Sequence, residues 1–228
     1  MTGPLLTVTH DEEEAAERVA EVLATAIESA RTVRGVAHLA LSGGSTPKLA
    51  HRKLGPRVGD WEGVHVWFAD ERCVGPDDPE SNARLVRETL DAPGAIVHRI
   101  PGELGPEAAA AAYAEELDDV VLDAVLLGMG PDGHTASLFP GHPALHADGA
   151  VVAIRDAPKP PPERVSLTLR TLNAAHRLVL LVTGEGKADA LARVVAGPDP
   201  EIPASLLERE RLEIVADEAA LARVSGDG

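Results

Sequence analysis

The chain has 228 residues, of which 44% are hydrophobic and only 2% are aromatic, so Ala, Val and Leu must build the core of an expected single domain over residues 1–228. The formal net charge of −16 excludes nucleic acid and anionic membranes as general partners, because an acidic surface repels both. The single cysteine excludes an internal disulfide, and no segment has the length and hydropathy of a membrane span or signal sequence, so we expect a cytoplasmic location.

Helix-like and strand-like segments alternate along the chain. Residues 11–34 are predicted to form an amphipathic helix that Gly35 can end. An apolar run at 36–41 predicts a buried strand, and a helix is expected to begin near Pro47, because proline is favoured in a first helical turn. Further strands are predicted at 64–69, 96–100, 124–127, 151–154, 178–182 and 212–215, the last of them an edge or late strand, and further helices at 105–119 and after 183–187.

This alternation predicts an α/β fold with a Rossmann-like, mostly parallel sheet and helices on both faces. The proline-rich stretch 158–162 is predicted to be an exposed loop. Ligands bind beyond the carboxyl ends of the strands in an open parallel sheet. We therefore expect one ligand-binding edge to gather the four polar motifs that directly follow predicted strands, SGGST (42–46), ADER (69–72), GMGPDGHT (128–135) and TGEGK (183–187).

The first motif is a glycine-rich turn before a helix. Gly43 and Gly44 allow the backbone to approach an anion closely, and Ser45 and Thr46 offer hydroxyl donors at the helix N-terminus. This pattern indicates phosphate binding, and a tight turn with a hydroxyl N-cap is an equally good interpretation. The motif is neither a Walker A sequence nor GxGxxG, so it gives no support to a dinucleotide site.

Basic residues near the other motifs have two interpretations each. Arg72 can pair with the neighbouring Asp70 or Glu71, or its planar guanidinium can bind phosphate or carboxylate. Lys187 is either a surface charge or a cation at the edge of the site. Arg164 precedes a strand-like VSLTL run, and from the pattern alone it is interpreted as an ordinary surface arginine.

His134 is the candidate general base. An imidazole with an ordinary pKa near about 6.5 is mostly neutral at cellular pH and can accept a proton. Asp132, two residues earlier, can orient the ring. The alternative is a plain turn, because Asp-Gly is favourable turn chemistry and the chain has nine histidines.

Other catalytic patterns are missing from the sequence. There is no GxSxG, which disfavours a serine esterase, and no HExxH. His142 and His146 are four residues apart, but Pro143 lies between them and no set of carboxylates accompanies them, so we predict no metal site. Cys73 stands beside Arg72, and a small buried residue is the favoured interpretation of it.

Taken together, these motifs resemble the 6-phosphogluconolactonase family, whose fold is shared with glucosamine-6-phosphate deaminases and ribose-5-phosphate isomerases. The resemblance covers nearly the whole chain, through LSGGSTP (41–47), WFADERCVGPDDPESNARL (67–85), LLGMGPDGHTASLFPG (126–141), RVSLTLRTLNAA (164–175), VTGEGKADAL (182–191) and IPASLL (202–207). The second and third of these segments are the most specific.

The resemblance implies hydrolysis of 6-phospho-D-glucono-1,5-lactone to 6-phosphogluconate in the oxidative pentose phosphate pathway, with no metal and no organic cofactor. It makes His134 the general base that activates water, assisted by Asp132. Functional coupling to glucose-6-phosphate dehydrogenase is a candidate partnership. Which cation meets the phosphate and which meets the oxyanion stays open. The phosphosugar lactone would be bound by Gly43, Gly44, Ser45, Thr46, Asp70, Arg72, Arg164 and Lys187.

Two rival functions differ in their sequence features. Amino-sugar-phosphate deaminases of the same fold tend to have an Ile-Ala-Phe-Asn-Glu type run after the shared DGH, and Asp-Glu-Tyr instead of the Asp-Glu-Arg at residues 70–72. This chain has TASLFP at 135–140 instead. A phosphosugar-sensing regulatory domain usually carries a DNA-binding segment, and neither a helix-turn-helix-sized extension nor a basic charge is present. Both differences favour the lactonase.

Overall fold

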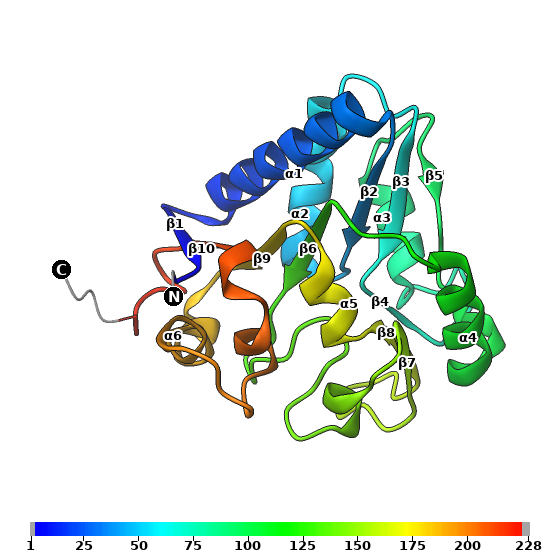
Figure 1. Ribbon diagram of the computed structural model, residues 1–228. Helices are drawn as coiled ribbons and strands as arrows, with labels where there is room; N and C mark the ends of the chain where they lie inside the picture. The colour runs from blue at the N-terminus through cyan, green and yellow to red at the C-terminus, as the bar shows by residue number, and fades with distance from the viewer. Residues whose placement is uncertain (1–2, 225–228) are drawn as a thin grey trace.

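The computed structural model describes residues 3–224, and a seven-stranded sheet in which all neighbours run parallel organises them (Figure 1). Its strands in spatial order are β1 (Leu5–Thr9), β10 (Leu212–Asp217), β9 (Leu178–Val182), β6 (Ala124–Gly128), β2 (Ala37–Leu41), β3 (Val64–Phe68) and β5 (Ile96–Val97). The predicted α/β fold with a mostly parallel sheet is confirmed. The one-domain prediction also includes residues 1–2 and 225–228, which lie outside the described residues, and it stays a prediction.

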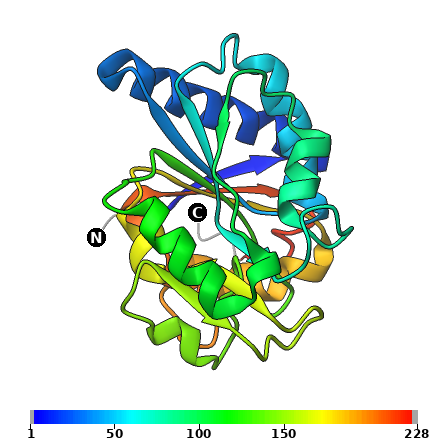
Figure 2. The same ribbon diagram turned by 90° about the vertical axis from the view of Figure 1, so that its right-hand side faces the viewer.

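Helices cover both faces of the large sheet, as predicted. They are α1 (Glu12–Arg34), α2 (Ser45–Leu54), α3 (Asn82–Thr89), α4 (Pro106–Leu117), α5 (Leu169–Ala174) and α6 (Ala188–Ala196). Helices α1 and α2 pack against each other on one side of the sheet, and α4, α5 and α6 lie on the other side (Figures 1 and 2). Within residues 3–224, no helix is both long and apolar enough to cross a membrane.

Helix α1 shows how a core with few aromatic residues is built. The Asp11 carboxylate accepts a hydrogen bond from the Glu14 amide at 2.9 Å and caps the helix, and Gly35 ends it with a φ of 77°. Fully burying one Val, Leu or Ile side chain stabilises the fold by roughly 1.5–3 kcal/mol. The buried face combines such side chains with small alanines: Ala15, Ala16, Val19, Ala20, Val22, Leu23, Ile27 and Ala30.

A second, antiparallel sheet lies below the first and contains β4 (Asp70–Arg72), β8 (Arg164–Leu167) and β7 (Val151–Ile154). The prediction that the strand ends at Ala69 is wrong, because β4 follows it directly. The Ala69 amide donates to Leu41 in the large sheet, and its carbonyl accepts from Leu167 in the small one. The strand therefore passes from one sheet to the other at Ala69, and the predicted strand 151–154 joins the small sheet.

Further elements also differ from the sequence prediction. β1 was not predicted; it is an edge strand with Leu5 and Val8 exposed, and it covers β10, which is consequently a late strand but not an edge. Helix α3 is only eight residues long and was also not predicted. The strand predicted at 96–100 is limited to two residues.

The order of the strands fixes where a ligand can bind. The chain leaves β2 toward β3 and β5 on one side and then returns to β6 on the other side of β2. This reversal creates a topological switch point at the carboxyl ends of β2 and β6, the usual ligand-binding position in open α/β sheets. The motifs SGGST and GMGPDGHT follow these two strands directly.

Candidate active site

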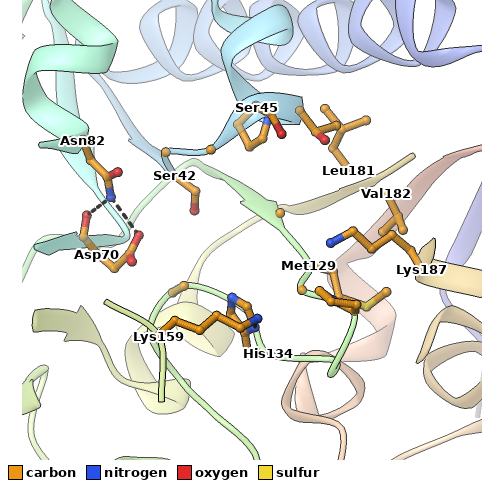
Figure 3. A pocket seen from close by; sticks show the side chains of 18 of the residues that line it. Ser42, Ser45, Asp70, Asn82, Met129, His134, Lys159, Leu181, Val182 and Lys187 are labelled. Carbon is orange, nitrogen blue, oxygen red and sulfur yellow. Dashed lines mark hydrogen bonds between the residues drawn. The ribbon is translucent and has the colours of Figure 1, made fainter. Parts of the chain in front are cut away.

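A cavity of about 240 Å³ opens at the switch point (Figure 3). Each of the four polar motifs contributes to its wall, and residues of helix α3 and of the stretch 158–162 complete it. Of the predicted site residues, only Asp132 is not part of the cavity wall. It contacts His134, which does line the cavity. The predicted residues that line the cavity are Gly43, Gly44, Ser45, Thr46, Asp70, Arg72, His134, Arg164 and Lys187.

The glycine-rich turn presents a helix N-terminus to the cavity. Gly44, with a φ of 110°, is the N-cap of α2, and no side chain caps the helix. The interpretation with a hydroxyl N-cap is therefore wrong, and the first amides of the helix remain available to an anion. A Cβ on Gly43 would lie 1.9 Å from Asn82 Oδ1, so the turn approaches α3 more closely than a larger residue allows.

His134 and Asp132 form a hydrogen-bonded pair at the edge of the cavity. His134 Nδ1 lies 2.5 Å from Asp132 Oδ1. The loop that carries them is folded tightly: the Gly130 amide donates to the His134 carbonyl at 2.9 Å, and Thr135 Oγ1 donates to the Gly128 carbonyl at 2.9 Å. The loop therefore holds the imidazole in one place before any ligand arrives.

The short contact assigns the tautomer of His134. A carboxylate oxygen only accepts, so the proton between the two groups belongs to His134 Nδ1. In the neutral ring the other nitrogen, Nε2, then keeps its lone pair and can accept a proton. Burial lowers the pKa of His134, an effect opposed by Asp132 and assisted by Lys159. The ring is therefore neutral, and able to act as a base, at near-neutral pH.

Asp70 occupies a buried polar corner of the cavity. Its Oδ2 accepts from Ser137 Oγ at 2.7 Å, and Asn82 Nδ2 donates to its Oδ1 at 3.2 Å and to its backbone carbonyl at 2.8 Å (Figure 3). The adjacent Glu71 caps helix α3, because its carboxylate accepts from the amides of Asn82 and Ala83. These contacts make Asp70 and Glu71 the anchor of the small sheet to α3.

Arg72 pairs with a residue that the sequence did not suggest. Its Nη1 donates to the Glu80 carbonyl at 2.5 Å and lies 3.4 Å from the Glu80 carboxylate, rather than pairing with Asp70 or Glu71 through its side chain. Its Nε is buried and makes no hydrogen bond within residues 3–224. The two hydrogen bonds of the side chain involve only Nη1, so Nη2 is the nitrogen through which this cavity-lining guanidinium can still donate.

Arg164 and Lys187 reach the cavity in different ways. Arg164 is 5% exposed, so it is not an ordinary surface arginine, and most of its donors are bound by backbone carbonyls of the stretch 158–162. Lys187 follows β9 in a short 3₁₀ turn, and Asp217 fixes this loop by accepting from the Gly184 amide at 3.0 Å. Burial and the neighbouring Lys159 lower the pKa of Lys187.

Sequence reasoning missed Lys159 and Asn82. Both line the cavity, and Lys159 Nζ lies 3.2 Å from both His134 Nδ1 and Asp132 Oδ1. Asn82 belongs to the SN that follows DERCV in the chain, which is the available signal for it. The sequence contains no comparable signal for Lys159, because the proline-rich stretch 158–162 predicts only an exposed loop.

Cys73 and His142, for which the sequence predicted no catalytic or metal-binding role, lie outside the cavity wall. Cys73 is only partly buried, so the prediction of a small buried residue is only partly correct; burial raises the pKa of its thiol to about 11. His142 Nε2 pairs with Asp156 at 2.8 Å. Within residues 3–224, no group of three or more His, Cys, Asp or Glu side chains is arranged to hold a metal ion.

Comparison with known proteins identifies the family of this fold and site. The family described as "Glucosamine-6-phosphate isomerases/6-phosphogluconolactonase" matches residues 10–216. The chain belongs to this family. Among its curated members, the 6-phosphogluconolactonase of Mycobacterium leprae is 39% identical over an alignment of 226 positions that covers 90% of this chain and 92% of that protein. That of Rattus norvegicus is 41% identical over an alignment of 213 positions that covers 85% of this chain and 80% of that protein.

Solved structures of the family share the fold in detail. The crystal structure of a putative 6-phosphogluconolactonase from Neisseria gonorrhoeae superimposes with a TM-score of 0.85 at 31% identity. The match covers 94% of this chain and 99% of that chain. The resemblance drawn from the motifs is therefore confirmed at the level of the family.

Proposed function

We propose that this chain hydrolyses 6-phospho-D-glucono-1,5-lactone to 6-phosphogluconate, the lactonase step of the oxidative pentose phosphate pathway. The observation that carries the proposal is that His134, hydrogen-bonded to Asp132, lines a cavity with several cationic side chains. The names of the related proteins support the same substrate. A location in the cytoplasm, where the phosphorylated sugar is made and used, belongs to the same proposal.

The proposed mechanism uses His134 Nε2 as the general base. It takes a proton from water while the water oxygen attacks the lactone carbonyl, and Asp132 stabilises the imidazolium that forms. The carbonyl oxygen becomes an oxyanion in the tetrahedral intermediate and needs positive charge or donors. Collapse of the intermediate breaks the bond to the ring oxygen, which receives the proton from His134. No covalent enzyme intermediate is required, because a δ-lactone is an activated ester.

The positively charged side chains in the cavity wall suit a phosphorylated substrate in a protein of net charge −16. We assign the phosphate to the N-terminus of α2 and to Arg72, because an uncapped helix start and a guanidinium with unused donors are both typical anion ligands. Lys187 is then the candidate donor for the oxyanion. Arg164 has fewer donors left for substrate, since backbone carbonyls bind most of them.

A deaminase or isomerase acting on an amino-sugar phosphate is the second candidate, because the description of the family names glucosamine-6-phosphate isomerases beside 6-phosphogluconolactonase. The chain's TASLFP run after DGH favours the lactonase. Neither reaction, as proposed here, passes through a metal or an organic cofactor. Association with glucose-6-phosphate dehydrogenase remains a candidate coupling rather than a requirement of the mechanism.

The test is a direct assay. Glucose-6-phosphate dehydrogenase generates the lactone, and acid release is followed with and without the purified chain, with correction for spontaneous hydrolysis. We expect the chain to accelerate acid release and to release no ammonia from glucosamine 6-phosphate. Ammonia release without faster lactone opening would replace the lactonase by the deaminase.

A further inference from the structure

Lys159 contacts both His134 and Asp132 directly, and a role in phosphate binding does not explain these contacts. It belongs to the proline-rich stretch 158–162, and its Nζ is 3.2 Å from Asp132 Oδ1 and 3.2 Å from His134 Nδ1. Figure 3 shows Lys159 next to His134. Both contacts are on the Nδ1 side of the imidazole. The nitrogen that would accept the proton from water, Nε2, is on the opposite side of the ring.

A buried guanidinium holds the backbone of Lys159 in place. Arg164 Nη2 donates to the carbonyls of Lys159 and Pro160, both at 3.1 Å, and Arg164 Nε donates to the Pro161 carbonyl at 2.9 Å. Proline rings restrict φ throughout this stretch, so little conformational entropy remains to be lost when the loop is ordered. The position of Lys159 is therefore fixed by Arg164, which belongs to strand β8.

The hydrogen-bonding capacities of the three groups define what Lys159 does. The Nδ1 proton of His134 already points to Asp132, so Nδ1 cannot also accept from the ammonium, and the 3.2 Å approach is a contact between a cation and the ring. The real acceptor of Lys159 is Asp132 Oδ1, which it shares with His134. We propose that Lys159 is a positioning residue that orients the Asp132 carboxylate toward His134 Nδ1 and keeps the imidazole neutral. This inference rests on the proposed role of His134 as the base.

The charges around His134 explain why such a residue is useful. Asp132 and Asp70 both favour a protonated ring, and burial and the Lys159 ammonium oppose it. Lys187, the other ammonium of the cavity, is itself repelled by Lys159 and attracted by Asp132. With Lys159 removed, the two carboxylates act on His134 without this local opposition. The pKa of His134 then rises, and a larger fraction of the ring is protonated and inactive as a base.

Proton NMR of the imidazoles tests this without any use of substrate. His134 is assigned among the nine histidines by comparison with His134→Asn, and its titration is followed in wild type, Lys159→Met and Lys159→Arg. Lys53→Met, on the far end of α2 and paired with Glu13 and Glu17, is the matched control for loss of one positive charge. We expect the pKa of His134 to rise by about one unit in Lys159→Met and by less than about 0.3 unit in the other two variants. An unchanged pKa in folded Lys159→Met overturns the proposal.

The assay adds a second readout. In Lys159→Met the acid limb of kcat/KM should move to higher pH by the same amount, with KM for the phosphorylated lactone changed less than about threefold at high pH. A rise in KM of about tenfold with an unmoved acid limb would make Lys159 a substrate ligand and overturn the positioning role. If the wild type does not open the lactone, the proposed function fails, and the NMR titration still decides the role of Lys159. Lys159→Gln replaces the methionine variant if the latter melts more than about 5 °C below wild type.

Discussion

His134 and Asp132 are two residues apart in the chain, and His134 Nδ1 lies 2.5 Å from Asp132 Oδ1. A single loop therefore supplies both the base and the group that orients it. Gly133, which lies between them, has a φ of 78°, a backbone conformation that glycine adopts without strain. Because both residues belong to one loop, a substitution of either is expected to leave distant elements of the fold in place.

The first prediction concerns the base itself. His134→Asn should reduce turnover by roughly 10²-fold or more, because water loses its proton acceptor. The acid limb of kcat/KM in the wild type should fall below pH about 6.5, since burial lowers the pKa of His134. A pH–rate profile of both proteins checks this, with a thermal melt to show equal folding. Near-normal turnover in folded His134→Asn would move the base to another residue.

Asp132→Asn should give a different signature. An amide no longer selects the Nδ1–H tautomer as a carboxylate does, so we expect turnover to fall by roughly 10²-fold. Loss of the carboxylate also removes a charge that raises the pKa of His134, so the residual acid limb should move to lower pH. This shift is opposite in sign to the shift expected for Lys159→Met. Acid limbs that move in the same direction in both variants would contradict the charge arrangement described here.

The sequence predicted the part of the site that depends on sheet geometry. A parallel sheet brings the ends of β2, β3, β6 and β9 to one edge, so the positions of Gly43, His134 and Lys187 follow from the alternation of strands and helices. Lys159 and Asn82 depend instead on how the small sheet and α3 pack beneath that edge. Neither a local period nor a turn signal encodes such packing. The same reason explains why the strand was predicted to end at Ala69, where hydrogen bonds to two sheets decide the structure.

Arg72 should favour the phosphorylated lactone over the lactone without phosphate. Arg72→Ala should reduce kcat/KM for the phosphorylated lactone by roughly 10–100-fold, as expected for loss of a charge-assisted hydrogen bond of about 1.5–3 kcal/mol. Turnover of plain gluconolactone should change less than about threefold. Arg87→Ala, an exposed arginine on nearby α3 paired with Asp77, is the matched control. Equal losses on the two substrates would place Arg72 away from the phosphate.

Gly43 should tolerate no side chain. Gly43→Ala places a Cβ 1.9 Å from Asn82 Oδ1, and Asn82 is held by its hydrogen bonds to Asp70. The turn must then shift, and KM for the phosphorylated lactone should rise about tenfold or more. Gly59→Ala is the control, because the methyl group that it adds would meet nothing within 4 Å and the φ of Gly59 is not in the left-handed region. Normal KM in Gly43→Ala would show that the turn does not contact the substrate.

Chelation should leave the reaction intact. The mechanism proposed here activates water with an imidazole, and it assigns no step to a Lewis acid. Dialysis against EDTA is therefore expected to change kcat by less than about twofold. Loss of activity that one added divalent ion restores would require a metal in the mechanism. A mock dialysis without chelator is the control.

The last prediction concerns stability rather than catalysis, and it depends on His51. This residue of α2 is fully buried, and its Nδ1 lies 3.2 Å from Thr89 Oγ1. The Thr89 hydroxyl already donates to the Leu85 carbonyl at 2.7 Å, so His51 Nδ1 must be the donor in this pair. Burial lowers the pKa of His51 to about 4.

The direction of the pH effect follows from that lowered pKa. In the unfolded chain His51 takes up a proton near pH about 6.5, whereas in the folded chain it stays neutral until about pH 4. Between these values the unfolded state binds more protons, so the free energy of unfolding falls as pH falls. Between pH 7.5 and 5 the contribution of His51 amounts to roughly 2 kcal/mol. Urea unfolding at the two pH values measures it. His51→Asn keeps a donor for Thr89 and does not titrate, so its stability should depend less on pH by about that amount, whereas exposed His10→Asn should behave as wild type. A His51→Asn protein with the wild-type pH dependence would assign the acid sensitivity to other groups.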